Sequence, residues 1–221
     1  QGARDEVSKI MTLLRGKPLV LNDSRLVTES ILVLAMVSSL YNTDTGWPEL
    51  NRAFKDAVKG RGIRLQRMAD DYVLRDKNGA YNSNENEIAY IVNCVDREDD
   101  ASIERTKADT IAISKIAPHF GPYIAWSALP CDYWPYPPMR PPVDLSGPDL
   151  PPFLMVGTTR DPATPYEWAQ SVAKRFPSGI LITADGDGHT GHGRGSACVD
   201  DAVDAYLLKG SLPAGALTCT L

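Results

Sequence analysis

The sequence predicts an α/β fold in which a layer of helices is followed by a parallel sheet. Two observations lead to this prediction. Residues 1–86 carry apolar side chains at helical spacing and show no strand pattern. In the last third of the chain, short apolar runs alternate with amphipathic segments of helical length, which is typical of a parallel sheet covered by helices. We therefore expect a helical part over residues 1–86 and a sheet-forming part over residues 87–221.

Four helices are expected in the helical part, because apolar residues recur on one face between glycines and prolines that break the pattern. Gly16 and Pro18 end the first helix, and Pro48 suits the first turn of the third. A loop rich in Asn, Asp, Ser and Gly follows over residues 75–87. The expected helices cover about residues 7–14, 26–41, 48–58 and 65–72.

The middle of the chain is expected to open with a strand. Ile88–Cys94 is β-branched, aromatic and almost entirely apolar, as in strands buried on both faces. A helix over about Ser102–Ala117 follows. Nine of the 17 prolines then lie between Pro130 and Pro152, which predicts an extended bridge without regular structure over residues 130–152.

The last third is expected to hold two strand–helix pairs. Phe153–Gly157 is a strand and Pro165–Phe176 a helix; Gly179–Ala184 is a second strand and Ala197–Leu208 a second helix. The carboxyl ends of such strands are where ligands and catalytic groups gather in open α/β sheets.

Composition and charge narrow the classes of partner. The chain has 221 residues and is 43% hydrophobic, with a net charge of −5, so it lacks the basic excess that nucleic acid or anionic lipid would attract. The longest apolar run, Ile31–Val37, is much shorter than the roughly 20 residues of a membrane-spanning helix. Asp5, Glu6 and Lys9 stand where a signal peptide has a basic segment followed by an apolar one, so these residues are not a signal peptide, although one could have been removed.

The four cysteines form no Cys-x-x-Cys pair, which argues against a zinc knuckle or a thioredoxin-type redox pair. Buried free thiols remain one interpretation. We favour two disulfides and an exported protein, because each cysteine lies near a loop or the end of an element. Three pairings are then open. The cysteines are Cys94, Cys131, Cys198 and Cys219.

An acid and a histidine follow the two strands of the last third. Asp161 lies between the first strand and its helix, and His189 lies in a glycine-rich loop after the second. Adjacent strand ends would bring them together as the orienting acid and the base of a Ser-His-Asp triad. α/β-Hydrolases place these two residues in this order after their serine. Such chemistry needs no metal and no cofactor.

Each of these residues also has a simpler interpretation. Asp161 alone is often a helix N-cap. The Asp185–Gly193 loop can be a turn, or a cation site in which Asp185, Asp187 and the histidines at 189 and 192 bind a metal. His119 is expected to lie at a helix end or in a loop.

Residues 151–219 contain Asp161-Pro162 followed by Thr164-Pro165, then Gly186-Asp187-Gly188-His189, a Cys-Val pair and a final Leu-Pro stretch before Cys219. This region resembles the C-terminal part of tripeptidyl-aminopeptidase-like serine hydrolases, which are exported α/β-hydrolases of the proline-iminopeptidase clan. A looser similarity covers Ala89–Asp96. Residues 1–86 fit the family only as its variable helical lid.

The resemblance implies an α/β-hydrolase fold whose C-terminal portion and helical lid this chain supplies. Asp161 would be the triad acid, His189 the triad base and Thr164 a support for Asp161. Cys94–Cys131 and Cys198–Cys219 would be disulfides. Asp96 and the acids after it would attract the free amino terminus of a peptide, although a solvated acidic patch at a helix start explains them as well.

The chain departs from the family in having no Gly-x-Ser-x-Gly nucleophile motif. The nearest sequence, Gly193–Ala197, has the wrong frame, and Ser38 and Ser39 lie in an expected helix. We therefore expect the serine on an N-terminal chain or segment outside these residues, and an aminopeptidase secreted or held in the cell envelope. The alternatives are an esterase or amidase with the same triad, and a non-catalytic, disulfide-stapled binding module.

Overall fold

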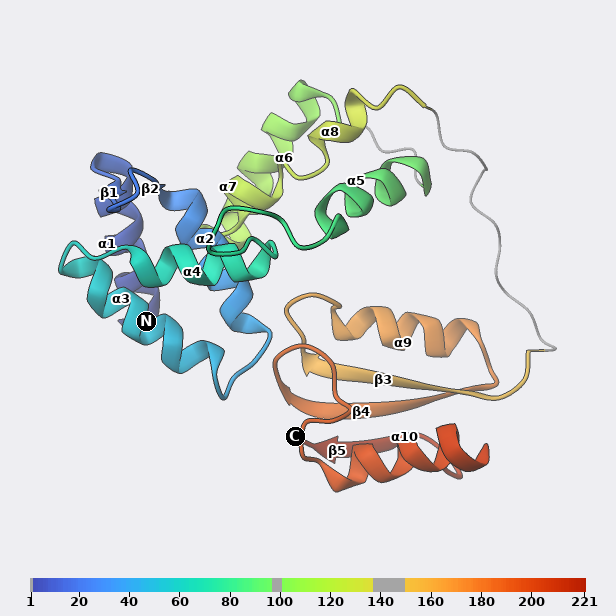
Figure 1. Cartoon of the computed structure of the whole chain (residues 1–221). Helices are drawn as coiled ribbons and strands as arrows, with labels where there is room; N and C mark the ends of the chain where they lie inside the picture. Colours follow the sequence, from blue (N-terminus) through green and yellow to red (C-terminus); the bar gives the residue numbers. More distant parts are fainter. Residues whose placement is uncertain (1, 97–100, 137–149) are drawn as a thin grey trace. The chain divides into compact units, whose positions relative to one another are not determined.

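The computed structural model describes residues 2–96, 101–136 and 150–221 (Figure 1). They form two compact units. We call the first the helical unit; its described residues are 2–38, 50–96 and 101–136. The second, the sheet unit, holds residues 150–221 together with residues 39–49. The helical unit thus extends past the expected boundary at residue 86.

Among the described residues, the helical unit contains eight helices and a short hairpin. The end of α2 and the start of α3 lie within residues 39–49, which belong to the sheet unit. The elements are α1 (Gly2–Gly16), β1 (Leu19–Val20), β2 (Leu26–Val27), α2 (Glu29–Leu40), α3 (Gly46–Val58), α4 (Ile63–Tyr72), α5 (Glu85–Asp96), α6 (Ile103–Ile116), α7 (Gly121–Ile124) and α8 (Leu129–Asp132).

The four helices expected before residue 75 are confirmed as α1 to α4. The expectation that this stretch contains no strand is wrong. β1 and β2 pair antiparallel, with Leu19 opposite Val27. Two-residue strands are too short to show an alternating pattern, so the sequence predicts a helix that already begins at Leu26. In the structure this helix, α2, begins at Glu29.

One apolar core holds these helices together. Ile10 and Leu14 of α1, Leu32 of α2 and Leu65 of α4 are each 0–1% exposed. Each such side chain contributes roughly 1.5–3 kcal/mol by burial. Phe54 of α3 packs into the same cluster. The apolar side chains of α1 thus lie on one buried face, as helical spacing predicts.

The strand expected at Ile88–Cys94 is wrong, because these residues belong to α5. The Glu85 N–H donates to Ser83 Oγ just before the helix, and Glu85 and Glu87 lie in its first turn, where carboxylates are favourable. Ile88, Tyr90, Ile91 and Val92 are 38–49% exposed, so this run is not buried on both faces. Cys94 is buried and forms a disulfide with Cys131 of α8.

The bridge expected over residues 130–152 is only partly testable, since residues 137–149 lie outside the described residues. Pro130 is part of α8, so the expectation of no regular structure is wrong at that end. Proline is tolerated in the first turn of a helix, where its missing N–H costs no hydrogen bond.

Within the described residues, no helix is both long and apolar enough to cross a membrane.

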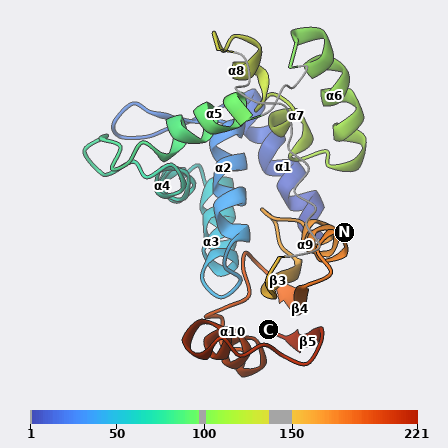
Figure 2. The same ribbon diagram turned by 90° about the vertical axis from the view of Figure 1, so that its right-hand side faces the viewer.

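The sheet unit is a three-stranded parallel sheet in the order β3-β4-β5. Figure 1 and Figure 2 show α9 and α10 on its two sides. Both predicted strands and both predicted helices are confirmed, whereas the short edge strand β5 was missed. The elements are β3 (Phe153–Arg160), α9 (Tyr166–Arg175), β4 (Gly179–Asp187), α10 (Ala197–Lys209) and β5 (Leu217–Thr220).

The packing of each helix follows from the alternation along the strands. Ile182 and Ala184 of β4 are buried against Val199 of α10. On the other face, a Cβ at Gly157 would lie 2.8 Å from Ala169 Cβ of α9, so glycine permits the close approach of that helix. A disulfide between Cys198 and Cys219, 21 residues apart, ties α10 to β5. Closing a loop of that length stabilises a fold by about 3 kcal/mol in the chain-entropy model.

Candidate active site

Two polar side chains meet at the carboxyl ends of β3 and β4. Asp161 directly follows β3, and His189 lies two residues beyond β4. The strands are parallel neighbours, with Arg160 opposite Asp187 at their ends. The loops that leave both strands therefore emerge at the same edge of the sheet.

His189 and Asp161 are in direct contact. His189 Nδ1 lies 2.9 Å from Asp161 Oδ1 and 3.0 Å from Oδ2. A carboxylate only accepts hydrogen bonds, so Nδ1 carries the proton and donates it. Nε2 is then the basic nitrogen, and no described residue forms a hydrogen bond with it. The His189 side chain is 28% exposed and that of Asp161 only 2%, so Nε2 belongs to an imidazole that solvent or a substrate can reach.

The Asp161 carboxylate is fixed by four further donors. Oδ1 accepts from the N–H groups of Ala163 and Thr164, at 2.8 and 2.9 Å. Oδ2 accepts from Thr164 Oγ1 at 2.9 Å and from the Thr190 N–H at 3.1 Å. Thr164 thus contacts Asp161 through both its N–H and its hydroxyl group. The N-cap of α9 is Pro165, so Asp161 closes the turn before the helix and does not cap the helix itself.

These contacts keep Asp161 charged. Burial raises the pKa of Asp161, but hydrogen bonds lower it by more, so that the pKa is about 2. The donors of these bonds are Thr164, Ala163, His189 and Thr190. A carboxylate that is ionised at neutral pH fixes the imidazole tautomer and stabilises the imidazolium that forms when Nε2 takes up a proton.

The loop after β4 holds a strained backbone beside His189. Thr190 has φ 67°, in the left-handed region that costs a branched residue free energy. Its N–H donates to Asp161 Oδ2, so the strained residue adds a contact to the carboxylate. Strain of this kind persists where the surroundings fix it, and it clusters at functional sites.

The cation-binding interpretation of this loop is not supported. Asp185 and Asp187 each accept from Arg160 at 2.9 Å, so both carboxylates already form an ion pair with one arginine. His192 Nε2 lies 3.1 Å from Asp204 Oδ1 of α10. In the described part of the chain, no three His, Cys, Asp or Glu residues are grouped so that they could hold a metal ion.

The other predicted residues lie in the helical unit. Asp96 is exposed at the last residue of α5, so it ends a helix and does not start one. The acids at 98–100 are outside the described residues. His119 lies in the loop after α6, where its Nε2 is 2.8 Å from Ser8 Oγ, as expected of a loop histidine. Tyr41, which the sequence did not single out, contacts His189 in the sheet unit.

Residues 117–219 match the family model described as TAP-like protein, an α/β-hydrolase family. This region is a TAP-like α/β-hydrolase domain. Its parallel strands β3 to β5 are consistent with the C-terminal portion of an α/β-hydrolase fold, so the fold class predicted from the sequence is confirmed.

Curated relatives of the TAP-like domain extend the similarity over most of the chain. The chain is 32% identical to serine protease Hip1 of Mycobacterium tuberculosis over 92% of its length, and 32% identical to tripeptidyl aminopeptidase of Streptomyces coelicolor over 80%. It is 31% identical to carboxylesterase B of M. tuberculosis over 92%. The chain spans only 33–39% of the length of these relatives.

Proposed function

We propose that this chain supplies the base and the orienting acid of an exported serine hydrolase, whose nucleophilic serine lies N-terminal to residues 1–221. The observation that carries the proposal is the contact from His189 Nδ1 to Asp161, at the ends of adjacent parallel strands in a TAP-like domain. The sequence contains no Gly-x-Ser-x-Gly motif, and the relatives are more than twice as long. A non-catalytic binding module would not explain why a buried carboxylate is held by five donors beside a partly exposed imidazole.

The proposed reaction is acyl transfer. His189 Nε2 takes the proton from the serine hydroxyl as its Oγ bonds to the substrate carbonyl carbon. The imidazolium, stabilised by Asp161, then gives this proton to the leaving group as the bond from the carbonyl carbon breaks. Water attacks the carbonyl carbon of the acyl-enzyme while Nε2 takes up a proton from that water. The imidazolium then gives this proton to the serine Oγ as the bond between Oγ and the carbonyl carbon breaks and the acid leaves.

A peptidase acting at the substrate's amino terminus is the favoured activity, because relatives over most of this chain are a serine protease and a tripeptidyl aminopeptidase. In this proposal the helical residues 1–86 form a lid that admits a chain end. The helical unit has a cavity of about 320 Å³ lined by Asn86, Tyr90, Asn93 and Ser127, among others, whose amide and hydroxyl groups suit a peptide backbone.

The relative named carboxylesterase B makes an esterase the second candidate. Two disulfides support export.

Asp96 is proposed to attract the substrate's ammonium group, which its exposed carboxylate would favour by charge alone. Turnover of a tripeptide p-nitroanilide with a free amino terminus tests this together with the peptidase assignment. The full-length protein should cleave it faster than the N-acetylated tripeptide or p-nitrophenyl butyrate. Asp96→Asn should raise KM for the free peptide about threefold, the scale of an exposed ion pair, with kcat unchanged.

Asp71 is an exposed carboxylate on α4. The matched control is therefore Asp71→Asn, which should leave KM unchanged. Preference for the ester would overturn the peptidase in favour of the esterase. An equal KM for Asp96→Asn and the unaltered protein would remove Asp96 from substrate binding.

A further inference from the structure

We infer that Tyr41 is a positioning residue that holds the His189 imidazole at the angle its catalytic role requires. The inference rests on the proposed function. Tyr41 directly follows α2 and is far from His189 in the sequence, yet residues 39–49 belong to the same compact unit as the loop after β4.

Two contacts join Tyr41 to His189, and they act on different parts of the histidine. The Tyr41 carbonyl accepts from the His189 N–H at 3.0 Å, which fixes the backbone. The two rings meet edge to face, with centroids 4.9 Å apart and planes at 71°. Aromatic pairs prefer this geometry. The Asp161 bond holds the imidazole at Nδ1 only, so contact along the ring limits how far the ring can rock and where Nε2 points.

The turn that carries Tyr41 is itself rigid. Asn42 Oδ1 accepts from the N–H groups of Asp44 and Thr45 at 2.9 and 3.0 Å, which closes the turn between α2 and α3. At Gly46, a Cβ would lie 2.3 Å from the Ser39 carbonyl oxygen, so only glycine allows the turn to close this tightly. A rigid support is what a positioning residue needs, since a loose one would let the ring move with it.

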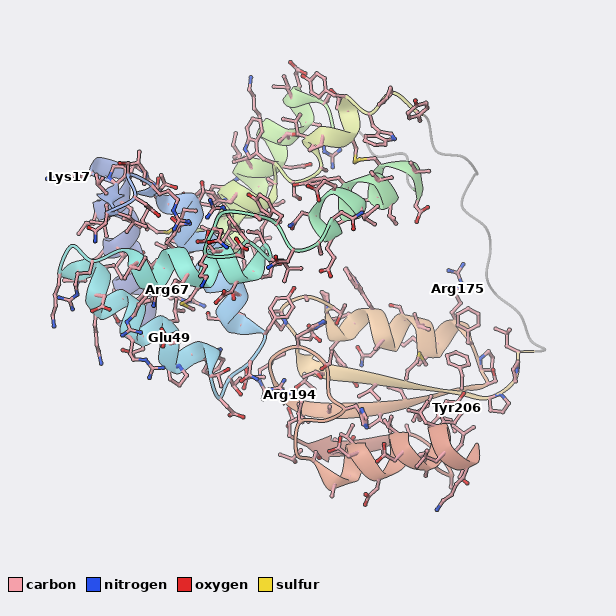
Figure 3. The ribbon with its side chains drawn as sticks, viewed as in Figure 1. Lys17, Glu49, Arg67, Arg175, Arg194 and Tyr206 are labelled. Carbon is pink, nitrogen blue, oxygen red and sulfur yellow. A yellow bond between two sulfur atoms is a disulfide. The ribbon has the colours of Figure 1, made fainter. Side chains whose placement is uncertain are left out.

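Arg194 of the loop after β4 contacts the same turn. Its Nη2 lies 3.5 Å from Thr43 Oγ1 and its Nη1 3.5 Å from the Thr190 carbonyl. The guanidinium also covers Gly188, where a Cβ would lie 2.4 Å from Nη1. Figure 3 shows Arg194 beside the turn that joins α2 to α3. The turn thus contacts His189 through Tyr41 and Arg194 through Thr43, and Arg194 itself contacts Gly188 and Thr190 on either side of His189.

Steady-state kinetics of the full-length protein test this inference, with kcat expressed per site titrated by a fluorophosphonate. Tyr41→Ala and Tyr41→Leu should lower kcat by about 10-fold, with KM within about twofold, because a misdirected base slows chemistry and not binding. Tyr41→Phe keeps the ring and the carbonyl and should keep kcat within about twofold. The proton NMR signal of the hydrogen bond between Nδ1 and Asp161 should broaden in the first two variants only.

Tyr133→Ala, which removes a tyrosine ring that is 67% exposed, is the matched control and should retain kcat. Normal kcat per titrated site in Tyr41→Ala and Tyr41→Leu would overturn the inference, even if both variants melt at lower temperature. An equal loss in Tyr41→Phe would also overturn it, since the ring would then not be the cause. Full turnover by His189→Ala would instead refute the proposed function itself.

Discussion

Replacing His189 with alanine in the full-length protein is expected to lower kcat on the order of 10⁶-fold, the scale seen when the base of a serine-hydrolase triad is removed. The reason is structural. Of the two ring nitrogens of His189, Nδ1 is bonded to Asp161 and Nε2 forms no hydrogen bond with a described residue, so Nε2 is the nitrogen that can take the serine proton. Folding should survive, because the imidazole is partly exposed. Turnover of the preferred substrate and thermal melting measure the two effects.

His192→Ala is the matched control for this prediction. His192 lies three residues further along the same loop, and its 45% exposed side chain contacts Asp204. An exposed ion pair of this kind contributes about 0–1 kcal/mol to the stability of the fold. Since its loss should therefore disturb the loop little, kcat should change by less than about threefold. Normal turnover in His189→Ala, or loss of turnover in both variants, would contradict the assignment of the base.

Asp161→Asn is expected to lower kcat by roughly 10³–10⁴-fold, because a neutral amide neither fixes the productive tautomer nor stabilises the imidazolium. It should also lower stability at neutral pH. The pKa of Asp161 in the fold is about 2, below its value near 4 in an unfolded chain, so the charged form is favoured by about 2 kcal/mol. That contribution is fully present above about pH 5 and is lost as the pH falls through 4 toward 2.

Urea unfolding from pH 6 to pH 2 measures this linkage. The difference in unfolding free energy between the unaltered protein and Asp161→Asn should shrink by about 2 kcal/mol over that range. Asp201→Asn, an exposed carboxylate on α10, should retain kcat and show no such change. A difference that stays constant with pH would mean that Asp161 is not held as the structure describes.

Local patterns predict the two site residues. Asp161 and His189 each follow a short apolar run closed by proline or glycine, and parallel strands bring such loop starts to one edge. The donors at Thr164 and Ala163 are two or three residues from Asp161 and follow from the tight turn. Tyr41 was missed, because its contact with His189 depends on tertiary packing between distant segments that no local pattern records.

The errors in the fold have the same origin. The run Ile88–Cys94 has the composition of a buried strand, but the hydrogen bond from the Glu85 N–H to Ser83 and the acids of the first turn favour helix α5. β5 is only four residues long and pairs with β4 at the edge of the sheet. Its place is fixed by that pairing and by the disulfide at Cys219, neither of which composition reveals.

The most direct test of the account is to label the full-length protein with a fluorophosphonate and map the modified residue by peptide mass spectrometry. We expect one labelled serine, within a Gly-x-Ser-x-Gly motif N-terminal to residue 1, and no label in His189→Ala. A label on a serine within residues 1–221, or labelling at the unaltered rate without His189, would contradict it.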